Sequence, residues 1–579
     1  MAVKTYLKSA LTILGFLFVF GAFTTACGQI IYVDDDADGA NDGSSWTDAF
    51  NYLQDALAAA NDGDEIRVAQ GIYKPDQGNG IKPGDREDTF QLINGVTIKG
   101  GYAGFGEPGP NTRDIELYKT ILSGDLNGND AEVAEPPDLR LEPTRSENSY
   151  HVVTGSGVDP SAILDGFTVT GGNSACGGGM YNEYGSPTVV NCTFIENSGG
   201  YDGAGGGMLN LHSSPTLTGC SFVRNAASWP GGGGMSNYKS SPTLTDCMFI
   251  GNTANSRMYG QGSGEGSAGA MDNWEDSSPT LINCIFIGNS ASTSGGAICS
   301  GGNYENTVSN PTLINCTIVG NSAGIRGGAI VQESGTLTLT NCIMWNNTGP
   351  DGNVMYLEEG YQVDATVNIS YSDIEGEQSG FYIEQGCTLN WGDGNIDADP
   401  LFIEPGYRDA NGVWIDGDYH LMTDSPCIDA GDPNYVAEPN ETDLDGRPRV
   451  LDGDNDGDLV VDMGAYEYSF TISAKARIIP RTINLASRGN WITCYIWLSE
   501  GDNVADIDPN SILLEGEIEA DTVEVDVERQ VVTAKFGRED VQPILEVGDV
   551  KLTITGRLMD GTVFEGTDTI KVIDKAGKN

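Results

Sequence analysis

The sequence predicts an all-β protein with three parts: a long parallel β-helix, a helix that caps its N-terminal end, and a C-terminal β-sandwich. Three observations lead to this prediction. A short motif repeats through the middle of the chain, a helical period occurs once before it, and alternating strands follow it. We assign the solenoid and its cap to residues 29–428, an acidic end module to residues 429–468, and the sandwich to residues 469–579.

Residues 1–28 have the layout of a secretory signal peptide. Two lysines precede an apolar run over residues 10–23, and small residues follow at Ala26-Cys27-Gly28. Cleavage after Gly28 would give a secreted protein, whereas lipid modification of Cys27, as in bacterial lipoproteins, would anchor it at the cell surface or outer membrane. Both routes predict an exported bacterial protein. No later segment has the roughly 18 apolar residues that a membrane-spanning helix needs.

The capping helix is predicted from one stretch of helical spacing. Apolar residues recur with this spacing between Trp46 and Ala60, after a strand at residues 31–33. The first coil of a solenoid leaves its core open to water and needs a cap. We therefore expect this helix to cover the N-terminal end of the stack.

The repeated motif joins a proline, a cysteine and an asparagine at fixed spacing. Five copies align without gaps, and a sixth lacks the proline: Pro187-Cys192-Asn197, Pro215-Cys220-Asn225, Pro242-Cys247-Asn252, Pro279-Cys284-Asn289, Pro311-Cys316-Asn321 and Cys342-Asn346. A glycine-rich element recurs between them, at residues 177–180, 205–208, 232–235, 268–271, 295–298 and 327–330. Copies follow one another after about 26 to 37 residues, too long for a β-hairpin, so each forms one coil of a solenoid.

The six periodic cysteines are predicted to point into the core. Alternating apolar residues flank each of them, as Val190 and Phe194 flank Cys192. Free cysteine is among the most buried residue types, which favours a ladder of small buried side chains. Rungs about 4.8 Å apart also lie within disulfide reach, so paired cysteines are the alternative.

The glycine element and a Phe-x-x-Asn element together resemble the repeats of polymorphic outer membrane proteins. The Phe-x-x-Asn copies are Phe194 to Asn197, Phe222 to Asn225, Phe249 to Asn252 and Phe286 to Asn289. Proteins of that family are surface proteins on a right-handed parallel β-helix, a pectin-lyase-like solenoid, and several are adhesins. The resemblance covers roughly residues 160–350 and implies the same handedness here.

The segment after the repeats resembles the end module of secreted bacterial β-helix proteins known by a choice-of-anchor domain. The matching stretches are residues 398–402, 425–431 and 462–467. Members of that group attach to the cell surface in different ways. The resemblance implies an extracellular surface protein and implies no activity.

An acidic loop in this module is predicted to bind structural Ca²⁺. Carboxylates alternate around glycine, and the expected ligands are Asp452, Asp454, Asp456, Asp458 and Asp462. This alternation lets oxygen atoms converge on one ion, although Met463 stands where an EF-hand has its last acidic ligand. A solvated acidic turn is the alternative, because Asp, Gly and Asn form turns without any ion.

The C-terminal part is predicted to be a β-sandwich, of immunoglobulin type. Residues 491–498 alternate in character as a strand does, and Asp560-Gly561 is typical of a hairpin turn. These strands follow the last repeat and share none of its motifs. We therefore expect an independent domain.

Candidate binding residues lie just after the glycine elements. The second residue after each methionine is asparagine, which predicts a ladder of Asn182, Asn210, Asn237 and Asn273. The third and fourth positions supply the predicted ligand-binding residues Tyr184, His212, Tyr238, Lys239, Trp274 and Glu275, whose aromatic faces could stack on sugars. If rungs are in register, neighbours lie about 5 Å apart. Weak catalytic candidates are His212, Lys239, Asp272 and Glu275; the alternative is a row of exposed turn residues.

The net charge and the small number of basic residues in the repeats exclude some classes of partner. With 83 acidic and 30 basic residues the net charge is −53, which excludes nucleic acid and acidic membrane surfaces as partners. Between His151 and Trp345 only Arg224, Lys239, Arg257 and Arg326 are basic, too few to bind a uronate polymer without Ca²⁺. A hydrolase needs two carboxylates about 5–9 Å apart.

We therefore predict an exported, non-enzymatic adhesin, carbohydrate-binding or scaffold protein whose partner is a carbohydrate or another cell-surface component. A polysaccharide lyase or glycoside hydrolase of the pectin-lyase-like fold is the alternative, with Asp272 paired to Glu275 or Asp276.

Overall fold

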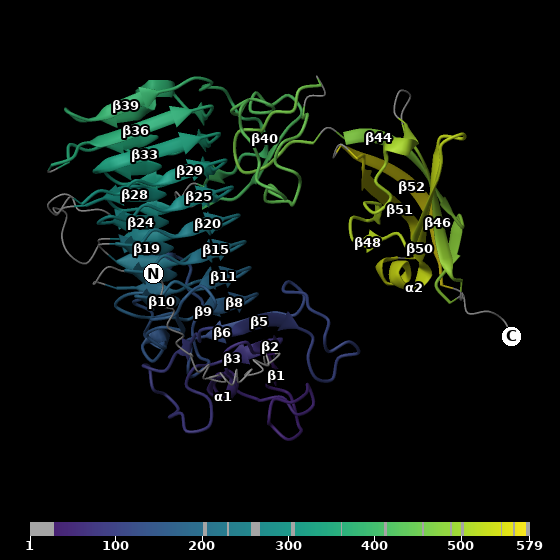
Figure 1. The fold of residues 1–579 in the computed structure, drawn as a ribbon, viewed down its shortest axis with the longest axis horizontal. Coiled ribbons are helices and arrows are strands. Elements are labelled where there is room, and N and C mark those ends of the chain that lie inside the picture. The colour runs from purple at the N-terminus through teal and green to yellow at the C-terminus, as the bar shows by residue number, and fades with distance from the viewer. Residues whose placement is uncertain are drawn as a thin grey trace, which may run out of the picture.

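The computed structural model describes residues 28–574 except residues 201–204, 229–230, 256–266, 303–306, 361, 410–413, 454–456, 470, 487–488, 499–502, 546 and 560–561. The predicted signal peptide before Gly28, with Cys27, lies outside the described residues. Figure 1 shows a tall stack of coils joined through a side module, around β40, to a separate C-terminal domain.

Three long sheets of parallel strands form the walls of the stack. Sheet A, with twelve strands, contains β1 Ile30–Val33, β2 Glu65–Ala69, β5 Thr97–Tyr102, β8 Ile163–Asp165, β11 Thr188–Val190, β15 Thr216–Thr218, β20 Thr243–Thr245, β25 Thr280–Ile282, β29 Thr312–Ile314, β33 Gly335–Thr340, β36 Ala365–Ser370 and β39 Thr388–Trp391. Sheet B, with ten, contains β3 Gly71–Tyr73, β6 Thr120–Ser123, β9 Thr168–Thr170, β12 Thr193–Ile195, β16 Ser221–Val223, β21 Met248–Ile250, β26 Ile285–Ile287, β30 Thr317–Val319, β34 Ile343–Trp345 and β37 Asp373–Ile374.

Sheet C, which carries the predicted binding residues, also has ten strands. They are β4 Phe90–Gln91, β7 Val153–Thr154, β10 Met180–Glu183, β14 Met208–Leu211, β19 Met235–Tyr238, β24 Met271–Trp274, β28 Ile298–Gly301, β32 Ile330–Gln332, β35 Met355–Leu357 and β38 Phe381–Ile383. A short fourth sheet contains β13 Ser198–Gly199, β17 Ala226–Ser228, β22 Thr253–Asn255, β27 Ser290–Ala291 and β31 Ser322–Ala323, and β18 Gly231–Gly232 pairs with β23 Ser267–Ala268. Short 3-10 helices lie at Pro136–Asp138, Pro143–Arg145, Glu377–Gly380, Val504–Asp506 and Gln542–Ile544.

Like residues stack on like residues because the sequence repeat equals one coil. The rings of Phe194, Phe222, Phe249 and Phe286 are parallel and 4.9, 4.7 and 4.7 Å apart. The six periodic cysteines are fully buried and none of the described cysteines forms a disulfide, so the ladder of free thiols is confirmed. Burial raises the pKa of Cys192 to about 12, which leaves this thiol unreactive at neutral pH.

A row of asparagines, one from each coil, runs beside the row of phenylalanines. Amide nitrogens donate to the next amide oxygen from Asn197 through Asn225, Asn252 and Asn289 to Asn321, at 2.9–3.2 Å. The last partner is Asn347, 3.0 Å from Asn321, and not the predicted Asn346, which has φ +54°. The sixth copy of the repeat therefore ends one residue later than predicted.

The capping helix is shorter than its apolar period. Helix α1 spans Leu53–Ala59 and buries Leu53, Ala56 and Leu57 against the first coil. The apolar residues before it, Trp46 and Ala49, are buried in turns instead. A cap is thus present, and only its second half is helical.

The solenoid ends at β39, and the chain then folds back along its side. Strands β40 Phe402–Glu404 and β43 Asp418–Leu421 pair with each other, as do β41 Tyr407–Arg408 and β42 Trp414–Ile415. Residues of this module pack on the outer face of sheet B, where Phe402, Tyr419, Leu421, Cys427 and Met463 meet Ile285, Ile287, Val319 and Ile343. The side module therefore begins before residue 429, the boundary predicted from composition.

The C-terminal domain has the predicted sandwich topology. One layer orders β44 Thr471–Ile479, β46 Trp491–Trp497, β50 Val531–Gly537 and β49 Thr522–Asp526; the other orders β45 Thr482–Asn484, β52 Val563–Ile573, β51 Gly548–Arg557, β47 Leu513–Leu514 and β48 Ile518–Glu519. Strand β44 joins them, because it pairs with both β46 and β52. The immunoglobulin type of this sandwich stays a prediction. Helix α2, Arg538–Val541, follows β50.

Candidate functional site

The predicted asparagine ladder of sheet C is present. Asn182, Asn210 and Asn237 donate from their amide nitrogens to the amide oxygens of the next rung at 2.9, 2.8 and 2.8 Å, and Asn273 donates to Ser300 Oγ at 3.0 Å. These asparagines are buried, because alternation along each strand turns them inward. The ladder holds the strands of sheet C in register and so fixes where the next turn begins.

The turn after each of four successive strands of sheet C carries one predicted residue, and these four residues form a column. Tyr184, His212, Lys239 and Glu275 have φ of +51°, +51°, +48° and +46°. Residues other than glycine rarely adopt this left-handed backbone conformation, which persists only where the surrounding structure imposes it. Backbone bonds link the rungs, since His212 N–H donates to Tyr238 O at 3.0 Å and Lys239 N–H to Glu275 O at 3.0 Å. The structure therefore brings these residues together as predicted.

The column presents aromatic rings to solvent at one end. Tyr184 and His212 stack with centroids 4.8 Å apart and planes 2° from parallel, and Tyr184 is 67% exposed. Tyr238 meets His212 edge-on at 5.9 Å. Three coils thus contribute to one aromatic strip whose spacing is set by the backbone.

The other end of the column is a charge pair beside an aromatic hydroxyl. Lys239 Nζ lies 3.3 Å from Glu275 Oε2, and the Tyr238 hydroxyl donates to the same oxygen at 2.8 Å. Burial and this hydrogen bond raise the pKa of Tyr238, and the Glu275 carboxylate raises the pKa of Lys239. Trp274, half-buried, pairs in register with Tyr238. The Glu275 carboxylate is therefore occupied by its contacts with Lys239 and Tyr238.

Asp272 lies on the outer face of β24, three residues before Glu275 in the chain. Its neighbours in register on the outer face of sheet C are Ser236 and Cys299. Asp272 is 5% exposed, and its Oδ1 has no hydrogen-bond partner among the described residues. Burial raises the pKa of Asp272 to about 8, so its carboxyl group is mainly protonated at neutral pH.

Asp272 belongs to a buried acid cluster that the sequence did not reveal: Asp272, Cys299, Arg326, Glu333 and Glu358. Cys299 Sγ lies 3.8 Å from Glu333 Oε1, while Arg326 lies 3.4 Å from Glu333 and 2.6 Å from Glu358. Burial, and then the charge of Glu358, raise the pKa of Glu333 to about 8. One arginine thus pairs with two carboxylates, of which Glu333 is buried and Glu358 half-buried.

Gly301 makes room for this cluster. A Cβ at Gly301 would lie 2.5 Å from Glu333 Cβ, too close for any side chain, and Gly301 pairs in register with Trp274. The one available sequence signal was that Arg326 is among the few basic residues of the repeats. Its carboxylate partners come from other coils and could not be identified without the register.

The predicted calcium ligands divide into two groups. Asp454 and Asp456 lie outside the described residues, whereas Asp452 Oδ2 accepts the Gly457 N–H at 3.0 Å. Asp462 is buried, and its two oxygens accept the N–H groups of Asp429 and Tyr468 at 2.7 and 2.5 Å. Burial raises the pKa of Asp462 to about 7. In this structure Asp462 holds two backbone segments, and Ca²⁺ binding by the loop stays a prediction.

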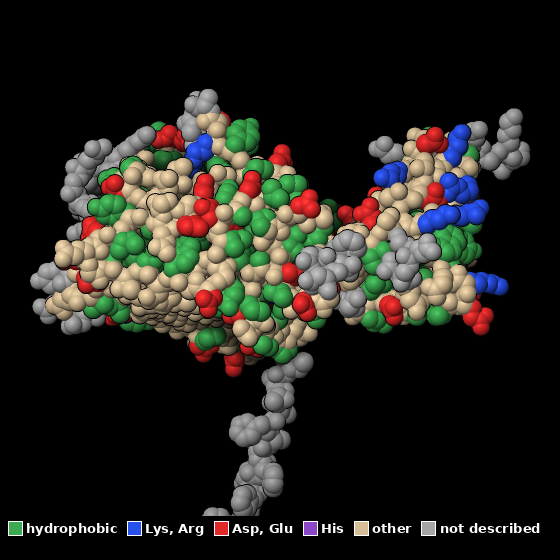
Figure 2. All heavy atoms as spheres, turned by 90° about the horizontal axis from the view of Figure 1, so that it is seen from above, with side chains coloured by type: hydrophobic (Ala, Val, Ile, Leu, Met, Phe, Trp, Pro, Cys, Tyr) green, Lys and Arg blue, Asp and Glu red, His purple; other side chains and the backbone are tan. Residues whose placement is uncertain are grey.

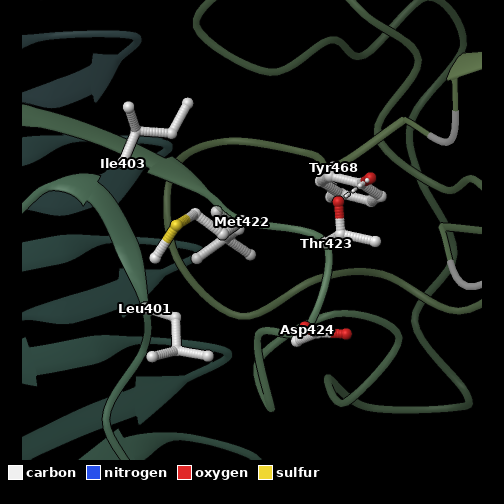
Figure 3. A pocket seen from close by; sticks show the side chains of 7 residues that line it. Leu401, Ile403, Met422, Thr423, Asp424 and Tyr468 are labelled. Carbon is white, nitrogen blue, oxygen red and sulfur yellow. Dashed lines mark hydrogen bonds between the residues drawn. The ribbon is translucent and has the colours of Figure 1, made fainter.

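A hollow of about 410 Å³ lies in the side module and is shown in Figure 3. Its lining is mainly apolar and includes Leu401, Ile403, Met422 and Tyr468, whose hydroxyl lies 2.9 Å from Thr423 Oγ1. Asp424 is the one charged side chain among the lining residues. The hollow therefore has no paired acid and base.

A known family model matches part of the solenoid. Residues 274–418 match a family model described as a right handed beta helix region. The chain is similar to the pectate lyase Pel9A, with 15% identity and a TM-score of 0.40, over 76% of this chain and 97% of that one. It is also similar to tailspike protein gp49 from Acinetobacter baumannii bacteriophage Fri1, a capsular polysaccharide depolymerase, with 12% identity and a TM-score of 0.24, over 89% and 81%.

A search of the curated proteins found no match. Among the described residues, none of the helices has the length and apolar character required to cross a membrane. Together, the family match and the parallel register of sheets A, B and C identify the repeat region as a right-handed parallel β-helix.

Proposed function

We propose that this protein is an exported, non-enzymatic carbohydrate-binding protein of the bacterial cell surface. It binds polysaccharide at Tyr184, His212 and Lys239 of the column and at the neighbouring ring of Tyr238. The observation that carries this proposal is the parallel stack of Tyr184 and His212, with Tyr184 67% exposed. Sugar rings have apolar faces that pack on aromatic rings, and an exposed ring held by a rigid scaffold loses little entropy on binding.

Charge favours a neutral or weakly charged polymer. Lys239 is the basic side chain of the column, and its charge is already paired with Glu275 at 3.3 Å. The protein as a whole carries a net charge of −53, which repels polyanions at long range. We therefore expect stacking and hydrogen bonding to dominate, with weak dependence on salt.

The decisive experiment incubates the mature protein, with Ca²⁺, against a panel of neutral and acidic polysaccharides and follows polymer size by chromatography. Intact chains that co-elute with the protein are expected. Tyr184→Ala with His212→Ala should abolish co-elution, whereas Tyr407→Ala, which removes a ring that is 62% exposed in the side module, should not. Equal binding by all three proteins would contradict the proposed site.

Hydrolysis is the second candidate, favoured by the buried acid cluster. A glycoside hydrolase needs one carboxyl group of raised pKa to donate a proton, and Asp272 and Glu333 both have pKa values near 8. Against it, both groups are buried, and a partner carboxylate must stay ionised. Shortened polymer chains that are lost in Asp272→Asn but kept in Tyr407→Ala would establish the enzyme.

Export and attachment complete the proposal. Residues 1–28 resemble a signal peptide, and the repeats and end module resemble those of polymorphic outer membrane proteins and choice-of-anchor proteins. The mass of the mature N-terminus distinguishes cleavage after Gly28 from lipidation at Cys27. Ca²⁺ in the 452–462 loop would be structural and would hold the side module together.

A further inference from the structure

We propose a Ca²⁺ site in the long connection between β6 and β7, formed by Asp125, Asp130 and Glu147 and completed by Asn148. This connection lies near the N-terminal end of the solenoid, far along the chain from the 452–462 loop and from the column on sheet C. The proposal is independent of the proposed carbohydrate binding. It rests on the geometry of the carboxylates and on buried oxygens that have no partner.

The spacing of the oxygens fits one calcium ion. Asp125, Asp130 and Glu147 each offer one carboxylate oxygen, and these three atoms lie within 4.8 Å of one another. Ca²⁺ binds oxygen at about 2.3–2.6 Å, so two of its ligands are at most about 5 Å apart. Ca²⁺ accepts an all-oxygen set in flexible geometry, whereas Zn²⁺ favours nitrogen or sulfur ligands.

The second observation is a group of buried acceptors without donors. Asp130 Oδ1, Glu147 Oε1 and Asn148 Oδ1 are all buried, and none has a hydrogen-bond partner among the described residues. Asn148 is 0% exposed and its side chain is directed at the cluster, because its amide nitrogen donates to Asp130 Oδ2 at 2.9 Å. A buried polar oxygen without a partner is unfavourable, and a shared cation would remove that penalty.

The backbone is folded to bring these ligands together. Asp125 Oδ1 accepts the N–H groups of Gly128 and Asn129 at 2.7 and 3.1 Å, and its Oδ2 accepts that of Asp130 at 3.0 Å. The loop thus returns Asp130 to Asp125. Asn148 is fixed from the other side, since its amide nitrogen also donates to Gly171 O at 2.7 Å.

Charge completes the argument. Arg145 NH1 pairs with Asp130 Oδ2 at 3.2 Å, and leaves Oδ1 available. Three carboxylates beside one guanidinium leave two negative charges uncompensated, which a divalent cation neutralises.

The test is calorimetric titration of the full mature chain with Ca²⁺ after removal of metal by chelation and dialysis. Glu147→Gln is the main variant, because it removes charge at an oxygen that has no hydrogen bond to lose. We expect wild type to bind at this site, and Glu147→Gln to lose one equivalent of Ca²⁺ or to bind it about tenfold more weakly. Asp130→Asn should have the same effect.

Controls separate this site from the acidic loop. Asp138→Asn removes an exposed carboxylate in the same connection and should leave the titration unchanged. Asp452→Asn with Asp458→Asn should leave the Glu147-dependent equivalent in place. Absence of Ca²⁺ binding in wild type, or identical stoichiometry and affinity in wild type and a folded Glu147→Gln protein, would overturn the proposal.

Discussion

The solenoid and the sandwich are both built from strands, but they achieve a specific core in different ways. In the solenoid one residue type repeats on every rung, as in the stack of Phe194, Phe222, Phe249 and Phe286. In the sandwich, strands from distant parts of the chain pack Ile478, Phe536 and Phe564 with many other residue types into one core. Each coil of the solenoid is therefore determined by contacts with the adjacent coils, whereas the sandwich core depends on contacts between residues far apart in the sequence.

The two regions differ in surface charge as well. Figure 2 shows Asp and Glu side chains spread over the visible face of the solenoid, whereas Lys and Arg side chains gather mainly on the sandwich. The two parts therefore need not share a partner. A binding face on the repeats must work with few basic side chains, because Arg224, Lys239, Arg257 and Arg326 are the basic residues between His151 and Trp345.

The largest effect is expected when a large side chain is removed from one core and the melting transitions of both domains are measured. Phe249→Ala removes the middle of the phenylalanine stack and should destabilise the solenoid by about 3–5 kcal/mol. The sandwich transition in differential scanning calorimetry should not move. Phe536→Ala, in the sandwich core, is the reciprocal control, and a shift of both transitions by either change would mean that the two parts unfold as one.

The second-largest expected effect is a dependence of the solenoid's stability on pH. Burial raises the pKa of Asp272 from 3.8 to about 8. The folded chain therefore holds this proton more tightly than the unfolded chain, so the stabilisation is complete below about pH 4 and is lost as pH rises through about 8. We expect the solenoid melting temperature to fall over this window and Asp272→Asn to reduce the fall. A fall of the same size in the variant would contradict the assignment.

A smaller, local effect is expected from the asparagine ladder. Asn237→Ala leaves the Asn210 amide nitrogen and the Asn273 amide oxygen without partners, at a cost of about 1–3 kcal/mol. Hydrogen exchange should rise in β14, β19 and β24 and stay unchanged in the sandwich. Asn390→Ala, which breaks an exposed amide pair with Asn368, is the matched control. Uniform protection after Asn237→Ala would show that the ladder adds no stability.

The smallest effect is expected from chelation of the acidic loop. In a Glu147→Gln background, where the proposed β6–β7 site is removed, chelator should lower the melting temperature of the side module by a few degrees. Asp452→Asn with Asp458→Asn should show the lower value without chelator. A melt that chelator does not change would remove the calcium prediction for residues 452–462.

The sequence predicted those features that repeat or alternate. Cysteine and asparagine at one position per coil were enough to predict two buried ladders, because identical spacing places identical residues on neighbouring rungs. The end of the sixth copy was assigned to Asn346, although Asn347 occupies the ladder. The five-residue spacing from cysteine to asparagine in the five aligned copies selects Asn347, and the hydrogen bonds agree with that spacing.

The sequence could not predict contacts between unlike positions. The column of Tyr184, His212, Lys239 and Glu275 follows from the repeat, but the partners of Asp272 do not. Arg326 reaches Glu333 and Glu358 from a loop, and Glu333 occupies the space that Gly301 leaves. Such contacts depend on loop paths and missing side chains, which no periodicity encodes. The ligands Asp125, Asp130 and Glu147 likewise come together only through a folded irregular connection.

The sheet C ladder also has a direction and an end. An asparagine both accepts and donates, so each rung can relay the bond it receives, from Asn182 to Asn273. Ser300 accepts the last of these bonds, and the residue in register with it on the next rung is Gln332, whose amide nitrogen donates to the backbone oxygens of Ser309 and Ser334. The relay between coils at this inward position of sheet C therefore runs from β10 to β28. On β32 the buried amide at the same position binds neighbouring backbone turns instead.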